Sequence, residues 1–411
     1  MNKYKKNFLI LFDQSIVSLG NFLITILLIK YLGIQEFGIF SFFWIFLMLV
    51  NSIQLSSIIS PMLSNAPKLN QRNIRYYYGG VLLQQIILSI ALFITVFIFL
   101  KFFFNIYFAY DVETLCLPFS LILISSQLFQ FCRRFLINKN SLILVNISDF
   151  VVYFTILFIF YYFKNYYFLN LEIILWSLFI VFILGSILLF PTFFYASFTV
   201  TGLLISIKDN WTIGKWLLLT SLVQWFSGNL WVLNAGVILG PYYLGIIRAC
   251  QTIIGIANPF FQSFENIYPK EVSKILVTKG KIAMSNYLRN NSIKIFLLII
   301  FFSLILILFS KKILLILYGK EMATFFKILI YLSFTMPITA LMYFPQYGLR
   351  SISKTKPIFL GYLTSSFFAL VLSNIIIQKL GLSGFIFGIY FSQFVILFII
   401  YTSYKHFLNK Y

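Results

Sequence analysis

Several charged and amide side chains lie inside apolar segments of this sequence, where such groups are costly. Asp13 and Gln14 lie in the first apolar segment, Asp149 lies in the fifth, and Arg248 lies in the eighth. A charge at such a depth in a bilayer costs several kcal/mol unless it faces water or a partner. These residues are therefore candidates for lining a polar path through the protein. Further amide candidates on the seventh and eighth segments are Gln224, Gln251 and Asn258.

Each of these side chains also has a plainer interpretation. Asp13 and Asp149 lie near the inner ends of their segments, so they can reach the interface or pair with a loop lysine. Arg248 can reach outward in the same way, and membrane amides commonly join neighbouring helices. Arg133 and Arg134 either mark the end of the fourth segment or receive an anionic headgroup at the inner mouth of the path.

The composition indicates that most of the chain is surrounded by lipid. Of 411 residues, 61% are hydrophobic and 10% are charged, which is too few charges for the surface of a soluble protein of this size. Long continuous apolar runs favour helices over a β-barrel, whose strands would show short alternating patterns. The sequence thus predicts an all-α polytopic membrane protein. Its twelve predicted spans are 8–29, 38–63, 78–100, 115–137, 142–163, 172–195, 216–239, 244–264, 293–311, 323–346, 357–377 and 384–403.

The net charge of +21 follows from topology and does not require nucleic acid as a partner. If the N-terminus lies inside, most lysines and arginines fall in inner loops, as the positive-inside rule requires. An even number of spans then places both basic termini in the cytoplasm. The basic residues left in outer loops are Lys30, Lys101, Lys164, Lys311, Lys312, Lys320, Lys327 and Lys379.

Two similar phrases about half a chain apart indicate an internal duplication. "LGIQEFG" at Leu32–Gly38 and "LGPYYLG" at Leu239–Gly245 are offset by 207 residues, and each lies between a first and a second span. Two six-helix halves of the same orientation would be parallel repeats, which place a substrate path between them. We therefore expect an N-terminal lobe at 1–200 and a C-terminal lobe at 201–411.

The residues that enzymes need for common chemistry are scarce. The chain has ten acidic residues, one histidine and three widely spaced cysteines, so we expect neither catalytic residues nor a metal site nor a cofactor. No G-x-x-x-x-G-K-[ST] motif is present, which argues against ATP hydrolysis. No loop is long enough to fold as a domain, so the function belongs to the membrane-embedded part.

The sequence resembles bacterial polysaccharide flippases, the Wzx-type branch of the multidrug/oligosaccharidyl-lipid/polysaccharide exporter superfamily. The N-terminal segment, which contains "LGIQEFG", carries the resemblance together with the second-half echo "LGPYYLG". Two further similar segments are "LYGKEM" at Leu317–Met322 and "KLGLSGFIFG" at Lys379–Gly388. The resemblance covers nearly the whole chain, and the order and spacing of the motifs carry it more than any single motif does.

The resemblance implies two six-helix lobes in a MATE-like V around a polar cavity. It also implies a flippase that moves undecaprenyl-pyrophosphate-linked repeat units from the inner to the outer leaflet of the bacterial cytoplasmic membrane. The product would be O-antigen or another surface polysaccharide, and the partners would be membrane lipids, a polysaccharide polymerase and a chain-length regulator. Asp13 and Arg248 are this chain's candidates for the charged cavity groups of that family. Two alternatives stay open: an ion-coupled drug or metabolite exporter of the same superfamily, and a membrane glycan polymerase.

Overall fold

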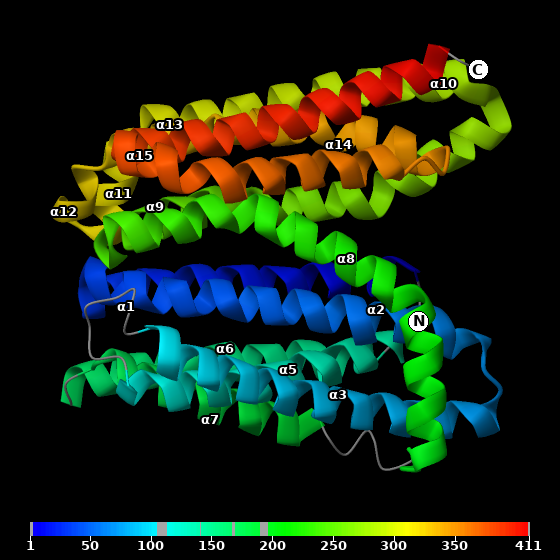
Figure 1. Ribbon diagram of the computed structural model, residues 1–411, viewed down its shortest axis with the longest axis horizontal. Coiled ribbons are helices and arrows are strands. Elements are labelled where there is room, and N and C mark those ends of the chain that lie inside the picture. Colours follow the sequence, from blue (N-terminus) through cyan, green and yellow to red (C-terminus); the bar gives the residue numbers. More distant parts are fainter. Residues whose placement is uncertain (1–2, 105–112, 140, 167–168, 190–195, 410–411) are drawn as a thin grey trace. The chain divides into compact units, whose positions relative to one another are not determined.

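The computed structural model describes residues 3–104, 113–139, 141–166, 169–189 and 196–409, and within these ranges the regular structure is helical throughout (Figure 1). Short π-helical turns follow α1 at Leu55–Ile59 and α3 at Leu100–Phe104. The helices are α1 (Lys3–Gln54), α2 (Ser60–Asn65), α3 (Gln71–Phe99), α5 (Glu113–Asn138), α6 (Leu142–Tyr166), α7 (Leu171–Leu189), α8 (Val200–Leu239), α9 (Pro241–Ile254), α10 (Asn258–Leu308), α11 (Ser310–Tyr318), α12 (Lys320–Ala323), α13 (Phe326–Ser333), α14 (Thr335–Ser351) and α15 (Lys356–Asn409).

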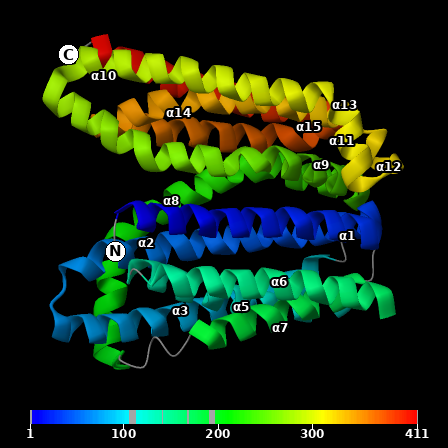
Figure 2. The ribbon, with the colours of Figure 1, turned by 180° about the vertical axis from the view of Figure 1, so that it is seen from behind.

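Among the described residues, ten helices are long and apolar enough to cross a membrane. Three of them are interrupted by a glycine outside helical geometry: α1 at Gly33 (φ 82°, ψ 172°), α10 at Gly280 (φ 78°, ψ −178°) and α15 at Gly381 (φ 57°, ψ −134°). Positive φ is accessible to glycine at little cost, which allows the sharp reversal. Figures 1 and 2 both show α1 as two runs that fold back on each other. The described residues therefore confirm the prediction of an all-α polytopic membrane protein.

The two runs of α15 also lie side by side. Ile358 on the first run packs with Ile396 and Ile400 on the second, in a buried cluster with Met342 and Leu349 of α14. This cluster holds the C-terminal hairpin against α14. It is an apolar core of the kind that the continuous hydrophobic runs predict.

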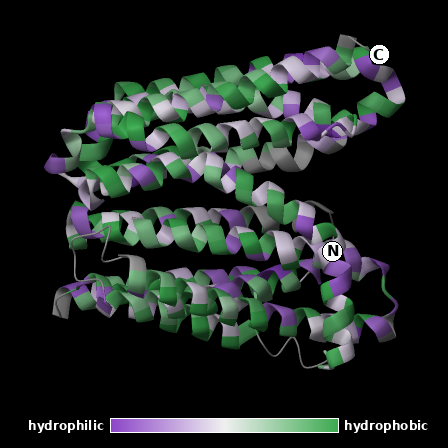
Figure 3. Ribbon diagram, viewed as in Figure 1, coloured by the Kyte–Doolittle hydropathy of each residue, from purple (hydrophilic) through white to green (hydrophobic). Residues whose placement is uncertain are grey.

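The helix α6 shows how one segment can face both lipid and protein. Apolar side chains on one face are exposed, and the opposite face is buried; helical spacing of three or four residues separates the members of each set. The exposed set includes Ile147, Phe150, Phe154 and Phe158, and the buried set includes Val145, Asp149, Val152 and Ile156. Figure 3 shows hydrophobic residues along the lengths of the membrane helices. An exposed apolar stripe of this kind is suited to acyl chains, whereas the buried face positions Asp149 inside the protein.

The chain divides into two compact units. The first unit contains Met1–Glu36 and Phe42–Leu222, and the second contains Phe37–Ser41 and Val223–Tyr411. The first half of α8 belongs to the first unit, because the Tyr77 hydroxyl donates to Asn210 Oδ1 at 2.7 Å and Asn65 Nδ2 donates to the Asp209 carbonyl at 3.2 Å. The division into an N-terminal lobe at 1–200 and a C-terminal lobe at 201–411, expected from the repeat, stays a prediction.

The glycines of the two repeated phrases have the same backbone conformation. Gly33 has φ 82° and ψ 172°, and Gly240 has φ 91° and ψ 169°. Both lie in a region that is essentially restricted to glycine. The two phrases therefore make the same kind of turn between consecutive membrane helices, which supports the interpretation of a duplication.

Candidate functional site

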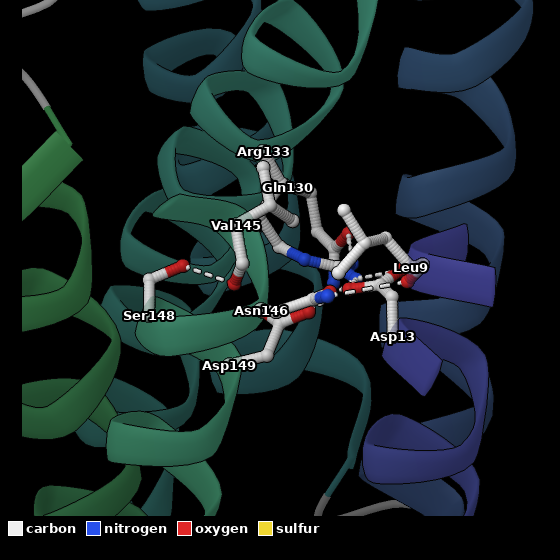
Figure 4. Close-up of polar contacts among 8 residues, drawn as sticks. All are labelled: Leu9, Asp13, Gln130, Arg133, Val145, Asn146, Ser148 and Asp149. Atoms are coloured by element: carbon white, nitrogen blue, oxygen red, sulfur yellow. Dashed lines mark hydrogen bonds and ion pairs between the residues drawn. The ribbon is translucent and has the colours of Figure 1, made fainter. Parts of the chain in front are cut away.

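Three of the predicted residues meet in a buried ion cluster inside the first unit. Asp13 of α1, Arg133 of α5 and Asp149 of α6 converge (Figure 4). Arg133 Nη2 donates to both carboxylate oxygens of Asp13 at 3.1 Å and lies 2.6 Å from Asp149 Oδ2. The three residues are 3%, 5% and 0% exposed, in that order. We refer to Asp13, Arg133 and Asp149 as the buried triad.

Neighbouring contacts fix the helices that carry the buried triad. Arg133 Nη1 donates to Gln130 Oε1 at 2.9 Å on the same helix, which restricts the guanidinium. Asn146 Nδ2, one turn before Asp149, donates to the Leu9 carbonyl of α1 at 3.2 Å. The first hydrogen bond restricts the Arg133 side chain, and the second holds α6 against α1.

A glycine allows α1 and α6 to approach each other closely beside the buried triad. A Cβ atom added at Gly20 would lie 2.7 Å from Cγ of Tyr153, closer than real side chains approach. Any larger residue at this position would push α1 away from α6. The small residue therefore serves the helix contact that the triad requires.

The buried triad combines two carboxylates with one guanidinium. With all three groups ionised, its net charge is −1, which is unfavourable in a buried site. Arg133 Nε and Asp149 Oδ1 make no hydrogen bond, so the network is only partly satisfied. The arrangement ties three helices together.

The sequence predicted an aqueous surface or a loop lysine opposite Asp13, and the structure places Arg133 there instead. Arg134, the next residue, is only half-buried, and Gln14 is half-buried beside Asp13. The roles proposed for Asp13, Gln14 and Asp149 in substrate binding, and for Arg133 and Arg134 in headgroup entry, stay predictions. The structure adds that Asp13, Arg133 and Asp149 are joined by ion pairs in one cluster.

A second polar region lies entirely within the second unit. Arg248 of α9 is half-buried, and its Nη1 donates to Gln251 Oε1 at 3.0 Å. Gln251 lines a cavity of about 320 Å³, and Gln224 of α8 lines the same cavity. This volume lies at the lower end of the range of small-molecule sites, roughly 300–1,000 Å³. The cavity therefore brings together Gln224 and Gln251, with Arg248 attached through Gln251, while Asn258 lies exposed at the start of α10 and outside its lining.

Other polar residues of this cavity were not predicted from the sequence. Gln393 and Ser392 of α15 line it, together with Trp231 of α8 and Tyr362 on the first run of α15. The Trp231 indole Nε1 donates to Ser392 Oγ at 2.9 Å, and Ser227 and Ser365 share a hydrogen bond of 2.9 Å. The Ser392–Gln393 pair inside an apolar span was the signal available in the sequence. We call this cavity, with its lining residues, the amide cavity.

Comparison with known proteins identifies the fold. No family model matches the chain, and no curated protein matches it. Among solved structures, the chain is similar to "Lipid II flippase MurJ, inward closed conformation", with a TM-score of 0.76 and 15% identity over 96% of this chain and 87% of that one. The chain has the same fold as this flippase. A second similar structure is an inward-facing multidrug resistance MATE family transporter of the MOP superfamily, with a TM-score of 0.79 and 12% identity over 97% and 95% of the two chains.

The same fold occurs in proteins described with different functions. A MOP superfamily transporter from Pyrococcus furiosus, described as having a binding pocket of reversed polarity that suggests a different function, is similar with a TM-score of 0.62 and 12% identity over 98% of this chain and 94% of that one. At such identities the similarity shows the fold alone. The function therefore has to be argued from the residues of this chain.

Proposed function

We propose that this protein is a flippase for lipid-linked oligosaccharides, which moves undecaprenyl-pyrophosphate-linked repeat units from the inner to the outer leaflet of the bacterial cytoplasmic membrane. Its substrate carries two phosphates and many hydroxyl groups. Each polar group that enters hydrocarbon without a partner costs several kcal/mol, so a membrane path for this substrate must supply partners. The flipped unit would then be used for O-antigen or capsule synthesis.

The observation that carries this proposal is the placement of Arg248. Its guanidinium lies in a membrane-spanning helix, is half-buried, and is joined by a hydrogen bond to an amide of the amide cavity. A guanidinium binds phosphate oxygens through two parallel hydrogen bonds and stays charged in a membrane. An arginine at this place suits an anionic pyrophosphate and disfavours a cationic drug. The fold shared with a lipid II flippase supports the same assignment.

The proposal can be tested by changing Arg248 in cells that make the surface polysaccharide. Arg248→Ala should reduce export about tenfold or more while the protein remains in the membrane, because a charge-assisted hydrogen bond to phosphate contributes roughly 1.5–3 kcal/mol. Arg248→Lys should retain part of the export, since the charge is kept and the paired geometry is lost. Arg289→Ala is the matched control, because Arg289 is an exposed arginine of the same unit. Full export by Arg248→Ala would reject the assignment of this residue.

An ion-coupled drug or metabolite exporter is the second candidate, and the similarity to MATE transporters favours it. Such a protein would bind cationic compounds near acidic side chains. In this chain two membrane-embedded carboxylates, Asp13 and Asp149, are both in contact with Arg133. Purified protein tested in parallel with a lipid-linked oligosaccharide and with cationic drugs separates the two candidates, because each predicts binding of only one class.

We propose the buried triad as the place where an ion gradient would act on transport. No ATP-binding motif occurs in the sequence, so the driving force has to be a gradient or consumption of the flipped product. Protonation of Asp13 or Asp149 would weaken the attraction to Arg133 and loosen α1 from α5 and α6. Transport in vesicles that is unchanged when the proton gradient is collapsed would reject this coupling.

A further inference from the structure

We infer that the amide cavity of the second unit is a binding subsite for an uncharged sugar ring of the transported lipid. This inference rests on the proposed function and names the part of the substrate that one site would recognise. The lining side chains are amides, hydroxyls, aromatics and aliphatics, and none of them carries a charge. Such a lining suits a sugar hydroxyl better than a phosphate or a carboxylate.

The hydrogen bonds already present determine which groups remain for a ligand. Arg248 can only donate, so the Gln251 atom that it contacts at 3.0 Å must be Oε1. The two hydrogens on Gln251 Nε2 are then left to donate to a ligand. The guanidinium therefore fixes the orientation of this amide and leaves a donor at the cavity.

Gln393 presents the opposite kind of group. The Thr339 hydroxyl donates its hydrogen to the Thr335 carbonyl at 2.9 Å, so it can only accept from Gln393 Nε2, at 3.3 Å. This chain of two hydrogen bonds leaves Gln393 Oε1 as an acceptor. That oxygen is buried and has no hydrogen-bond partner. A buried acceptor without a partner costs about 1–3 kcal/mol, so it is a place where a ligand hydroxyl would be favourable.

A sugar hydroxyl matches these two amides because it donates and accepts at once. It can donate to Gln393 Oε1 while it accepts from Gln251 Nε2, and the two residues come from different helices that line one cavity. Trp231 and Tyr362 add aromatic walls for the apolar face of a sugar ring. The cavity volume of about 320 Å³ has room for one six-membered ring with its hydroxyls.

The test compares two lipids on the purified full-length protein in nanodiscs. The first is the lipid-linked oligosaccharide extracted from a strain that lacks this protein, and the second is undecaprenyl pyrophosphate without sugar. The ratio of their dissociation constants measures recognition of the sugar alone, because contributions of the pyrophosphate and the lipid tail cancel. Wild-type protein should bind the glycan-bearing lipid about tenfold more tightly, as expected for one or two net hydrogen bonds.

Variants of the two glutamines should change this ratio in different ways. Gln393→Leu removes the acceptor, and Gln251→Met removes the donor, so each variant should reduce the ratio of dissociation constants to about one. The affinity of Gln393→Leu for undecaprenyl pyrophosphate should stay within about twofold of wild type. Gln393→Glu keeps an acceptor oxygen at the same position and should retain most of the ratio. Asn229→Leu is the control, because the Asn229 amide donates to the Trp225 carbonyl of its own helix and lies outside the lining.

Each outcome of this experiment decides something. An unchanged ratio in Gln393→Leu and Gln251→Met would overturn the inference and leave a cavity filled by water. If Gln393→Leu does not accumulate, Gln251→Met decides by the same ratio, because it changes a different helix. Wild-type protein that binds both lipids equally would overturn the sugar subsite and leave the flippase proposal standing. Wild-type protein that binds neither lipid would reject the flippase proposal itself.

Discussion

Removing Arg133 should destabilise the protein more than removing any exposed arginine. Its guanidinium lies 3.1 Å from Asp13 and 2.6 Å from Asp149, and all three residues are at least 95% buried. At 3.1 Å and an effective dielectric constant of about 20, one ion pair is worth roughly 5 kcal/mol before the cost of desolvation. Arg133→Met would leave two carboxylates buried next to each other without a counter-charge. We expect a loss of about 3–5 kcal/mol in the free energy of unfolding.

The compensating variant separates stability from transport. In Asp13→Leu/Arg133→Met/Asp149→Leu no charge remains, and replacing a buried ion cluster by apolar residues is often neutral or stabilising. We therefore expect this triple variant to be about as stable as wild type. If the triad takes part in coupling, the triple variant will be stable but will not export.

The assay is the fraction of monodisperse protein that remains after heating, measured by fluorescence-detected size exclusion of detergent-solubilised variants. Arg134→Met is the matched control, since the neighbouring arginine on α5 is only half-buried, and it should cost less than Arg133→Met. Arg133→Met as stable as wild type would refute the argument that these residues form a buried ion cluster. A triple variant as unstable as Arg133→Met would show that the loss comes from packing instead of charge.

Two further predictions concern the repeated turns and the topology. Gly33→Ala and Gly240→Ala should each cost about 1–3 kcal/mol, because both glycines have a positive φ that alanine rarely adopts. Gly228→Ala, a helical position with no atom within 4 Å of an added Cβ, should be neutral or slightly stabilising in the same heating assay. Equal stability of all three variants would contradict the assigned backbone. A reporter that is active only in the cytoplasm should be active when fused to the C-terminus, since the twelve predicted spans and the basic inner loops would place both ends inside. Activity of a periplasmic reporter there would contradict this predicted topology.

The sequence was sufficient to predict the membrane helices and their turns. Twenty apolar residues can satisfy their backbone groups only as a helix in lipid, and Gly33 and Gly240 mark reversals that their positive φ explains. These features depend on short-range physics that is visible in one dimension. The same argument predicted the span that contains Asp149 and that its charge needs either water or a partner.

The partner of each charge was not predictable from the sequence. The sequence predicts Arg133 either at the end of a helix or at a headgroup site of the inner mouth, and it is 120 residues from Asp13 along the chain. Helical spacing places Asp149 on the same face as the buried Val145 and Val152, so the sequence pattern indicates that Asp149 is buried. The pattern does not indicate which helix packs on that face. The amide cavity was only partly anticipated, because a serine or glutamine in an apolar span fits helix packing as well as ligand binding. Only the three-dimensional packing shows that Gln251 and Gln393 line the same cavity.

The most direct test of the proposed transport is the leaflet in which lipid-linked repeat units accumulate when this protein is absent. In spheroplasts of a strain that lacks the gene, single lipid-linked repeat units should accumulate where an added periplasmic probe cannot reach them, and surface polysaccharide should be lost. Restoring the wild-type gene should return both to normal. Lipid-linked units that reach the outer leaflet in normal amounts without this protein would contradict the proposal that it is their flippase.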